Sequence, residues 1–513
     1  MLSTVLSAGI VGIDAQPVSV EIDLANSQLP GFQIVGLPDA AVKESRERVR
    51  AAIKNSGFAF PMRQITVNLA PADVRKVGPA YDLPIALGIL AATHQVKPER
   101  VEGYSVLGEL SLDGQVRRVN GVLPVAIQCK RDKAKGFICP QGNGSEAALV
   151  QDLAVHPVET LGQLVDSLGE GGALPVQAAT RSADEWLSTE FADLDLSEVK
   201  GQEHAKRALE IAAAGGHNIL LVGPPGSGKS MLAKRLPGIL PPLSFEEALE
   251  ITKIYSIVGL LPENAGVISK RPFRSPHHTI SAAGLIGGGS YPTPGEVSLA
   301  HLGVLFLDEL PEFRRDVLEV LRQPMEDGRV TIARASSTVT FPAQFALVAA
   351  MNPCPCGFYG DALRQCTCTP QQVATYLKRI SGPLMDRIDL HVTVPRVGYE
   401  KLRQVREGET SAAVRGRVTA ARQRQLARYR GTAYSCNAVA PARLFESETP
   451  LPAESQALLK RAVDTLGLSA RAYTRVLKIA RTIADLDGRA EIGTADVAEA
   501  IQYRTLDRMG LAV

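Results

Sequence analysis

The first residues with an evident chemistry form a glycine-rich stretch that matches the pattern G-x-x-x-x-G-K-[ST] at every fixed position. The apolar run Ile219–Val222 precedes the stretch, and residues 231–236 continue it as a candidate helix. Such a loop between a strand and a helix can turn its N–H groups around a triphosphate. Lys229 is expected to reach the β- and γ-phosphates, and the Ser230 hydroxyl to bind Mg²⁺. The expected nucleotide-binding residues of this loop are Gly223, Pro224, Pro225, Gly226, Ser227, Gly228, Lys229 and Ser230.

A second group is the acidic pair Asp308 and Glu309, which follows the apolar run Val304–Leu307. An open α/β sheet binds its ligands at the carboxyl ends of its strands, where this pair would lie. Asp308 is therefore expected to bind the nucleotide's Mg²⁺ through water, and Glu309 to orient and polarise the attacking water. A solvated strand end is the alternative interpretation. With the phosphate loop, the pair predicts an ATP hydrolase that uses Mg²⁺.

The order of these motifs resembles the AAA+ ATPase module. The segment 199–202 (Val-Lys-Gly-Gln) is similar to the wall on the adenine side of that module. Another apolar run, residues 345–351, ends in Asn352, which matches the sensor 1 position. The resemblance implies that Asn352 contacts the γ-phosphate or the water, although an ordinary strand-ending Asn before Pro353 would look the same.

Residues 381–389 resemble the arginine-finger segment of the magnesium-chelatase and MCM branches of AAA+. The resemblance implies that Arg387 reaches the nucleotide of a neighbouring subunit, where such a residue can contribute about 10³–10⁵ in rate. A finger that acts in trans requires a homo-oligomer, which in this superfamily is usually a hexameric ring. An intramolecular surface pair with Asp386 or Asp389 is the alternative.

The C-terminal part is predicted to be mostly helical and to form the lid of the module. Residues 469–475 open a long helix with Ile479, Ile483 and Leu486 at helical spacing. Arg471 stands where the chelatase branch has sensor 2, which touches the γ-phosphate from the lid. Arg475 lies one turn further along the same face, so the choice between the two arginines stays open.

The bulk properties describe an ordinary water-soluble class of chain. At 513 residues we expect about two to four domains. The formal net charge is only +2, so affinity for nucleic acid must come from local patches. The sequence has no apolar run of the roughly 20 residues that span a bilayer, and the N-terminus is a poor signal peptide. Seven cysteines, four of them bunched, favour reduced thiols or a metal site in the cytoplasm.

The N-terminal block, residues 1–168, resembles the proteolytic domain of Lon-type proteases, which has a ribosomal-protein-S5-like α/β fold. The resemblance rests on residues 108–122 and on residues 78–82 with the apolar helix that follows. Where the Lon motif has its nucleophilic serine, this chain has Ala80. Without a hydroxyl there is no attacking group, so we expect the fold without the peptidase chemistry.

These observations predict an α/β chain with four parts. Residues 1–168 form the Lon-like N-terminal domain and residues 169–190 a linker. Residues 191–396 form a doubly wound AAA+ core with a phosphate-binding loop, and residues 397–513 the helical lid.

Four cysteines follow sensor 1 as two C-x-C pairs: Cys354, Cys356, Cys366 and Cys368. Four thiolates can close a tetrahedral Zn²⁺ site, although C-x₂-C spacing is commoner. Free thiols in a mobile loop are an equally open interpretation. The neighbouring histidines 277 and 278 are not expected to bind a metal, since adjacent side chains point in different directions.

Three further stretches are candidates for contact with DNA. Residues 267–300 form a glycine-rich insertion that we expect to be mobile. Residues 328–339 predict a β-hairpin that carries Arg329 and Arg334. Residues 401–430 hold nine Lys and Arg and only two acids, a basic helical face. Arginine contacts to phosphates would bind DNA without reading its sequence, and solvated surface arginines are the alternative.

The order of a Lon-like block, a chelatase-type core and a lid resembles the YifB/ComM family over almost the whole chain. Residues 271–278, 295–310, 352–357 and 381–390 carry this resemblance best. It implies an ATP-driven, hexameric branch-migration helicase that acts on single-stranded or branched DNA in recombination during natural transformation. The alternatives are an ATPase subunit of a metal chelatase and a protein-remodelling chaperone without protease activity.

Overall fold

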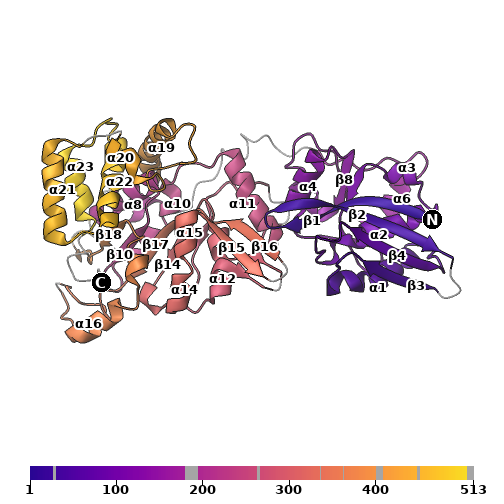
Figure 1. Ribbon diagram of the computed structural model, residues 1–513, viewed down its shortest axis with the longest axis horizontal. Helices are drawn as coiled ribbons and strands as arrows, with labels where there is room; N and C mark the ends of the chain where they lie inside the picture. Colours follow the sequence, from indigo (N-terminus) through magenta and orange to yellow (C-terminus); the bar gives the residue numbers. More distant parts are fainter. Residues whose placement is uncertain are drawn as a thin grey trace. The chain divides into compact units, whose positions relative to one another are not determined.

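The computed structural model describes residues 1–26, 30–178, 194–262, 266–289, 291–334, 337–361, 363–399, 408–447 and 451–504. The chain forms two compact units (Figure 1). The first comprises Met1–Ser188 and Phe245–Ile268, and the second comprises Thr189–Ser244 and Ser269–Val513. Most of the segment expected to be a linker, residues 179–190, lies outside the described residues.

The first unit is built on a seven-stranded mixed sheet of order β3-β4-β2-β1-β5-β8-β9. The strands β1 and β2 form an antiparallel pair that continues into β4, and the other neighbours pair in parallel. The strands, drawn in indigo and purple in Figure 1, are β1 (Leu2–Val11), β2 (Asp14–Ala25), β3 (Gly31–Val35), β4 (Gln64–Ala70), β5 (Tyr104–Val106), β8 (Gly136–Pro140) and β9 (Val155–Val158).

The helices of the first unit are amphipathic or fully buried. Asp39 caps the first of them by accepting a hydrogen bond from Val42 N at 2.8 Å. Every residue of the second is buried, as expected for a helix that is apolar on all sides. They are α1 (Ala40–Asn55), α2 (Asp82–Ala92), α3 (Pro98–Val101), α4 (Val122–Arg131), α5 (Gly144–Ala147), α6 (Leu161–Leu168) and α11 (Phe245–Ile257).

The two stretches that carry the Lon resemblance meet in space. Ala80 lies in a 3₁₀ turn directly before α2, and its carbonyl accepts from Gly108 N at 2.8 Å. The Gly108 carbonyl in turn accepts from Leu83 N. The ribbon of β6 (Glu109–Leu110) and β7 (Val116–Arg117) follows. These backbone hydrogen bonds thus fix the chain at Ala80, the position at which the Lon motif has its serine.

The second unit contains a five-stranded parallel sheet of order β11-β14-β17-β10-β18. The strands are β10 (Ile219–Val222), β11 (Phe273–Arg274), β14 (Val304–Leu307), β17 (Ala346–Met351) and β18 (Leu390–Thr393). The predicted apolar runs are its three central strands, each buried over nearly its whole length. This confirms the doubly wound α/β core.

Short helices and two hairpins surround this sheet, and longer helices form the lid, drawn in orange and yellow in Figure 1. The hairpins are β12 (Gly287–Gly288) with β13 (Thr293–Pro294), and β15 (Arg329–Arg334) with β16 (Ser337–Pro342). The helices around the sheet are α8 (Glu203–Gly215), α9 (Lys229–Ala233), α10 (Leu236–Ile239), α12 (Ala282–Ile286), α13 (Glu296–Leu299), α14 (Arg315–Glu319), α15 (Arg322–Asp327), α16 (Pro370–Leu377) and α17 (Gly382–Met385). The lid helices are α19 (Ser411–Arg428), α20 (Ala442–Ser447), α21 (Ala453–Leu466), α22 (Ala470–Leu486) and α23 (Thr494–Gln502).

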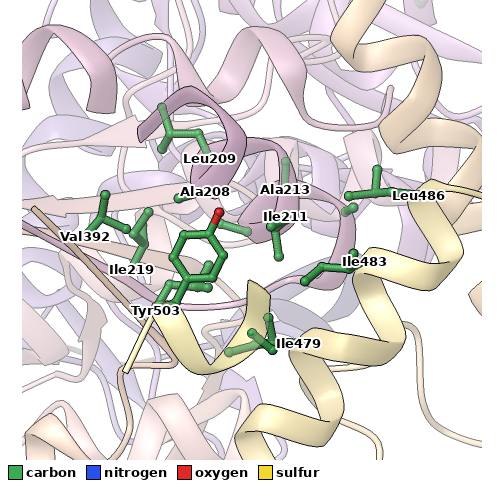
Figure 2. Packing of buried hydrophobic residues seen from close by; sticks show 14 of the residues in the cluster. Ala208, Leu209, Ile211, Ala213, Ile219, Val392, Ile479, Ile483, Leu486 and Tyr503 are labelled. Atoms are coloured by element: carbon green, nitrogen blue, oxygen red, sulfur yellow. The ribbon is translucent and has the colours of Figure 1, made fainter. Parts of the chain in front are cut away.

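One apolar core joins the lid to the sheet. Ile479 and Ile483 project from α22 as their helical spacing predicts, and both are buried. Figure 2 shows them gathered with Ile211 of α8, Ile219 of β10 and other side chains around Tyr503. Because each large apolar side chain in such a core contributes about 1.5–3 kcal/mol by leaving water, the lid is anchored mainly by this core.

The basic face of α19 is used within the unit. Its arginines bind carbonyl and carboxylate groups of α8, α10 and α22, so they pack the lid rather than form a free phosphate track. The hydrogen bonds are Arg415 to the Gly238 carbonyl, Arg417 to Glu210, Arg422 to the Ala213 carbonyl, Arg424 to the Asp485 carbonyl and Arg428 to the Asp485 carboxylate. The beginning of the basic stretch, residues 401–407, lies outside the described part of the chain.

Candidate active site

The phosphate loop connects β10 to α9, as the sequence predicts. Gly226 and Gly228 have φ angles of 75° and 95°, a left-handed conformation that favours glycine. Gly223 passes so close to the β18 end of the sheet that a Cβ atom there would lie 2.1 Å from the Val394 carbonyl oxygen. The loop therefore needs glycines both for its turn and for its close packing.

The Lys229 ammonium is buried inside this loop. It donates hydrogen bonds to the Gly223 and Pro224 carbonyls at 2.8 and 2.9 Å and to Asn352 Oδ1 at 3.2 Å. Burial lowers the pKa of Lys229, while the charges of Asp308 and Glu309 act to raise it. Lys229 thus bridges the phosphate loop and the predicted sensor 1 residue.

The acidic pair lies beside the loop. Ser230 Oγ donates to Asp308 Oδ2 at 2.7 Å, so the two predicted Mg²⁺ ligands are adjacent. Glu309 is 59% exposed, with a left-handed backbone (φ 53°), and its Oε2 lies 3.7 Å from His278 Nδ1. Hydroxyl and carboxylate oxygens are donors that Mg²⁺ prefers. The Ser230 and Asp308 side chains therefore fit a Mg²⁺ ion that is also bound by the phosphates of ATP. Glu309 stays open to solvent, from which a water could enter.

His278 is a neighbour of the site that the sequence did not point to. Its ring packs against that of His277 at 4.0 Å and edge-on against Phe313. Two adjacent histidines indicate neither a metal site nor this contact, because the sequence does not show that the segment after β11 returns to the end of β14. The pairing of β11 with β14 would have been the sequence signal for this contact. Because β11 is only two residues long, it leaves no alternating pattern to recognise.

Gln202 connects the predicted adenine-side wall to the loop. Its side-chain amide donates to the Ser227 carbonyl at 3.2 Å and to the Pro395 carbonyl at 2.5 Å. Gln202 also precedes α8 in a left-handed conformation, φ 61°. One side chain therefore fixes the phosphate loop against the segment that leaves β18.

Arg387 lies at the N-terminal end of β18, the end of the strands opposite to the phosphate loop. Its carbonyl accepts from Asn218 Nδ2 at 3.0 Å, and Asn218 precedes β10. The Arg387 guanidinium is nearly buried, pairs with Glu326 and donates to the Pro383 carbonyl at 2.6 Å. The predicted alternatives, Asp386 and Asp389, are not the partners that this side chain contacts in the described structure.

The two sensor 2 candidates have different surroundings. Arg471 is exposed on the first turn of α22 and has no side-chain partner among the described residues. Arg475 is mostly buried and pairs with Asp389, which also accepts from Asn218 N at 3.2 Å. Burial lowers the pKa of Arg475 to about 10. Arg475 is therefore committed to a structural pair, whereas Arg471 is not.

The four predicted cysteine ligands come together. Their sulfur atoms all lie within 4.8 Å of one another. Cys354 Sγ lies 3.4 Å from Cys356 Sγ and 3.7 Å from Cys366 Sγ. Backbone N–H groups, that of Phe358 first, lower the pKa of Cys356 to about 5. The cluster directly follows β17 and Asn352, so it is part of the nucleotide site's border.

The two insertions pack on one another. Val330, Ile332, Val339 and Phe341 of the β15–β16 hairpin are buried, while Arg329 and Arg334 are exposed. The glycine-rich arm includes α12 and the ribbon β12–β13, and Gly287 and Gly288 are buried. A Cβ atom on Gly287 would lie 3.0 Å from Ile332 Cδ1. The arm was expected to be mobile, but its described residues pack, because glycine lets two backbones approach closely.

No helix in the described part of the chain is long and apolar enough to cross a membrane.

Three family descriptions match successive parts of the chain: subunit ChlI of Mg-chelatase (residues 20–143), magnesium chelatase subunit ChlI (195–402) and its C-terminal part (408–504). Competence protein ComM of Haemophilus influenzae is 45% identical over 512 residues, covering 99% of this chain and 98% of the relative. The uncharacterized protein YifB of Salmonella typhimurium is 45% identical over 514 residues, with the same two coverages. The magnesium-chelatase 38 kDa subunit of Rhodobacter capsulatus is 26% identical over 175 residues, 31% of this chain and 49% of that protein.

Proposed function

Because the chain belongs to the YifB/ComM family of magnesium-chelatase-like AAA+ proteins, we propose that it is an ATP-driven DNA translocase. In this proposal it assembles as a hexamer in the cytoplasm and moves branched or single-stranded DNA joints during recombination in natural transformation. The name of the Haemophilus influenzae relative, a competence protein, supports the biological setting. The observation that carries the proposal is an arginine-bearing hairpin inserted directly before the sensor 1 strand of an ATPase site.

ATP and Mg²⁺ are the proposed cofactors. Ser230 and Asp308 would bind the metal, which supplies charge neutralisation on the β- and γ-phosphates when bound. Lys229 would exchange its carbonyl partners for phosphate oxygens, and Glu309 would accept a hydrogen bond from the attacking water. Asn352, which accepts a hydrogen bond from Lys229 in this structure, would contact the γ-phosphate or that water.

The place of Arg387 in the sheet supports the assembly of several copies of the chain into a ring. The parallel pair of β10 and β18 runs from Ile219 opposite Leu390 to Val222 opposite Thr393. Four strand residues span about 13 Å, so Arg387 and the phosphate loop lie at opposite ends of these strands within one subunit. Arg387 would therefore complete an ATP site in another copy of the chain, where its guanidinium would exchange Glu326 for a phosphate, as a finger in a ring does.

DNA is the proposed partner of the β15–β16 hairpin. One face of the hairpin carries the buried Val330 and Ile332, with the exposed Arg334 at its tip, and the other face presents Arg329 and Thr331. Exposed arginines on a hairpin that leads into sensor 1 could couple the binding of phosphates to hydrolysis. Such contacts bind without sequence preference, as a translocase requires.

A hairpin variant and a control variant test whether DNA is this partner. Replacing Arg329 and Arg334 with Ala should weaken DNA binding and lower the slope of log affinity against log salt by about 1 for each phosphate that the variant no longer binds. Fluorescence anisotropy with a forked oligonucleotide at several salt concentrations measures both quantities. Arg314→Ala is the matched control, because Arg314 is exposed but lies outside the hairpin. Equal weakening in the control and the hairpin variant would contradict the assignment.

Branch migration of a forked substrate tests the activity. Wild type should move the branch in the presence of ATP, and Lys229→Ala and Glu309→Gln should not. Glu309→Gln should still bind ATP, with hydrolysis reduced by about 10²–10⁴. If wild type hydrolyses ATP and moves no branched DNA, the helicase proposal fails. ATPase stimulation by porphyrin partners or by unfolded protein, instead of DNA, would favour a metal-chelatase subunit or a remodelling chaperone.

Zinc is the third proposed cofactor, at the four cysteines. Four thiolates close a tetrahedral shell and leave no position for water, which is the pattern of structural rather than catalytic zinc.

A further inference from the structure

The four-cysteine loop, described at residues 352–361 and 363–368, has its sulfur atoms at metal-ligand distances. Tetrahedral Zn²⁺ with Zn–S bonds of about 2.3 Å separates its sulfur ligands by about 3.8 Å. The Sγ atoms of Cys354, Cys356 and Cys366 lie 3.4 to 3.7 Å apart, and all four sulfurs lie within 4.8 Å. A small contraction or expansion of the loop would therefore suffice to bind the ion.

Backbone donors already surround the sulfur atoms. Cys356 N points at Cys368 Sγ at 3.4 Å, Cys368 N at Cys366 Sγ at 3.4 Å, and Tyr359 N at Cys354 Sγ at 3.3 Å. N–H donors of this kind orient and stabilise thiolate ligands in metal sites. Each sulfur that accepts such a bond keeps a second direction for the metal.

The loop also packs directly on the phosphate loop. Gly357 has a φ of 85°, and a Cβ atom there would lie 2.6 Å from Pro225 Cδ and 3.9 Å from Asn352 Cγ. The turn between the two cysteine pairs thus lies against both the nucleotide loop and sensor 1. Asn352, two positions before Cys354, bonds to Lys229.

A second contact fixes the far end of the loop. Asp361 is 4% exposed by its side chain and pairs with Arg396 Nε at 3.3 Å. The Phe358 ring lies near the guanidinium groups of Arg364, at 4.1 Å, and Arg396, at 5.1 Å. Since Arg396 follows β18 just after Pro395, whose carbonyl accepts from Gln202, the loop is braced on both sides of the phosphate loop.

We propose that Cys354, Cys356, Cys366 and Cys368 bind one structural Zn²⁺, and that this zinc clamp positions Asn352 and the phosphate loop for hydrolysis. The cysteines are positioning residues, since they act through Asn352 and Pro225 and touch no reacting atom. The positioning of Asn352 and the phosphate loop rests on the proposed ATPase activity. The clamp predicts that losing the metal impairs turnover more than nucleotide binding, because Lys229 and the loop glycines remain.

The metal is tested on the full-length chain by elemental analysis for zinc and iron. Wild type and Cys436→Ser, whose thiol lies outside the cluster, should hold about one zinc per chain, and Cys366→Ser with Cys368→Ser should hold none. Replacement by Co²⁺ should give the visible absorption of a tetrahedral thiolate site. Wild type without zinc, or with iron in its place, overturns the metal assignment, and this result is independent of any DNA activity.

The positioning role is tested by separating turnover from binding. Zinc stripped from wild type with a mercurial reagent and a chelator should lower kcat at least tenfold while the Kd of a fluorescent ATP analogue changes less than threefold. Gly357→Ala keeps all four thiols but cannot keep its close packing on Pro225, so it should retain zinc and lose turnover in the same way. Unchanged kcat in both preparations overturns the positioning role. Absence of hydrolysis in wild type would instead refute the proposed ATPase and leave the zinc result standing.

Discussion

The two sensor 2 candidates on α22 differ in whether their charge is already neutralised. Arg475 is held by Asp389 at the base of β18, and Arg471, one turn earlier on α22, has no such partner among the residues described. A side chain that must reach a phosphate from the lid needs freedom to move. The geometry therefore favours Arg471 as sensor 2.

Replacing these two arginines should have different effects. Arg471→Ala should lower ATP turnover and leave the free energy of unfolding unchanged. Arg475→Ala should lower the free energy of unfolding by about 3 kcal/mol, since it leaves a buried carboxylate without its cation. Steady-state ATPase assays and urea unfolding of both variants give the comparison. A stable Arg475→Ala protein with abolished turnover would reverse the assignment.

At the scale of elements, polar groups join α22 to the base of the sheet. His217, just before β10, is fully buried, with Nδ1 3.3 Å from Asp389 Oδ2 and Nε2 2.9 Å from Thr482 Oγ1. Burial lowers the pKa of His217 to about 3, and the cations of Lys478, Arg475 and Arg422 act in the same direction. The lid therefore docks on a neutral imidazole.

This histidine should make the second unit sensitive to acid. Its pKa in the unfolded chain is about 6.5. Because the folded value is lower, the unfolded state takes up the proton first, and the stabilisation present above pH 6.5 falls as the pH decreases towards 3. By pH 5.5 the decrease should be about 1.4 kcal/mol.

Urea unfolding at pH 7.5 and 5.5 measures this decrease. His217→Gln should remove that part of the pH dependence, and His94→Gln, at an exposed position, should not. An identical pH dependence in wild type and His217→Gln would show that the pKa of His217 is not lowered in the folded state.

The apolar runs and glycine motifs predicted the central strands of the ATPase sheet, because buried strands and phosphate loops have local signatures. They also predicted that Ser230, Asp308 and Asn352 would meet, since parallel strands end at one edge. The contact of His278 with Glu309 and the packing of Gly357 on Pro225 depend on where long connections return. No local pattern encodes those contacts. The sequence also left the two interpretations of the basic face of α19 open, because the carbonyl partners of its arginines have no sequence signature.

At the scale of the whole molecule, the separation of Arg387 from its own phosphate loop predicts complementation between subunits. Arg387→Ala and Lys229→Ala proteins should each hydrolyse ATP poorly. Mixed in equal amounts and allowed to exchange subunits, they should regain activity at about a quarter of interfaces, where an intact loop meets an intact finger. ATPase assays of the mixture decide this. Activity that stays at the level of the separate variants would mean that Arg387 is not a finger in trans.

The first unit is discontinuous in sequence, which predicts the behaviour of fragments. The segment Phe245–Ile268 supplies α11, and Gly121 N donates to the Ser256 carbonyl at 3.0 Å while Arg118 donates to Leu261 O at 2.9 Å. A fragment of residues 1–178 should be less stable than one in which residues 245–268 follow through a flexible linker. Thermal unfolding of the two fragments provides the measurement, and equal midpoints would contradict the prediction.

The same discontinuity has a consequence during synthesis on the ribosome. The first unit cannot complete its fold when its last sheet strand, β9, leaves the exit tunnel, because residues 245–268 have not yet emerged. By the time that segment emerges, β10 and the phosphate loop have also left the tunnel, without the sheet partners β17 and β18 that come later in the chain. The nascent chain must therefore hold two incomplete units at once, and a pause while residues 178–245 emerge would lengthen that exposure.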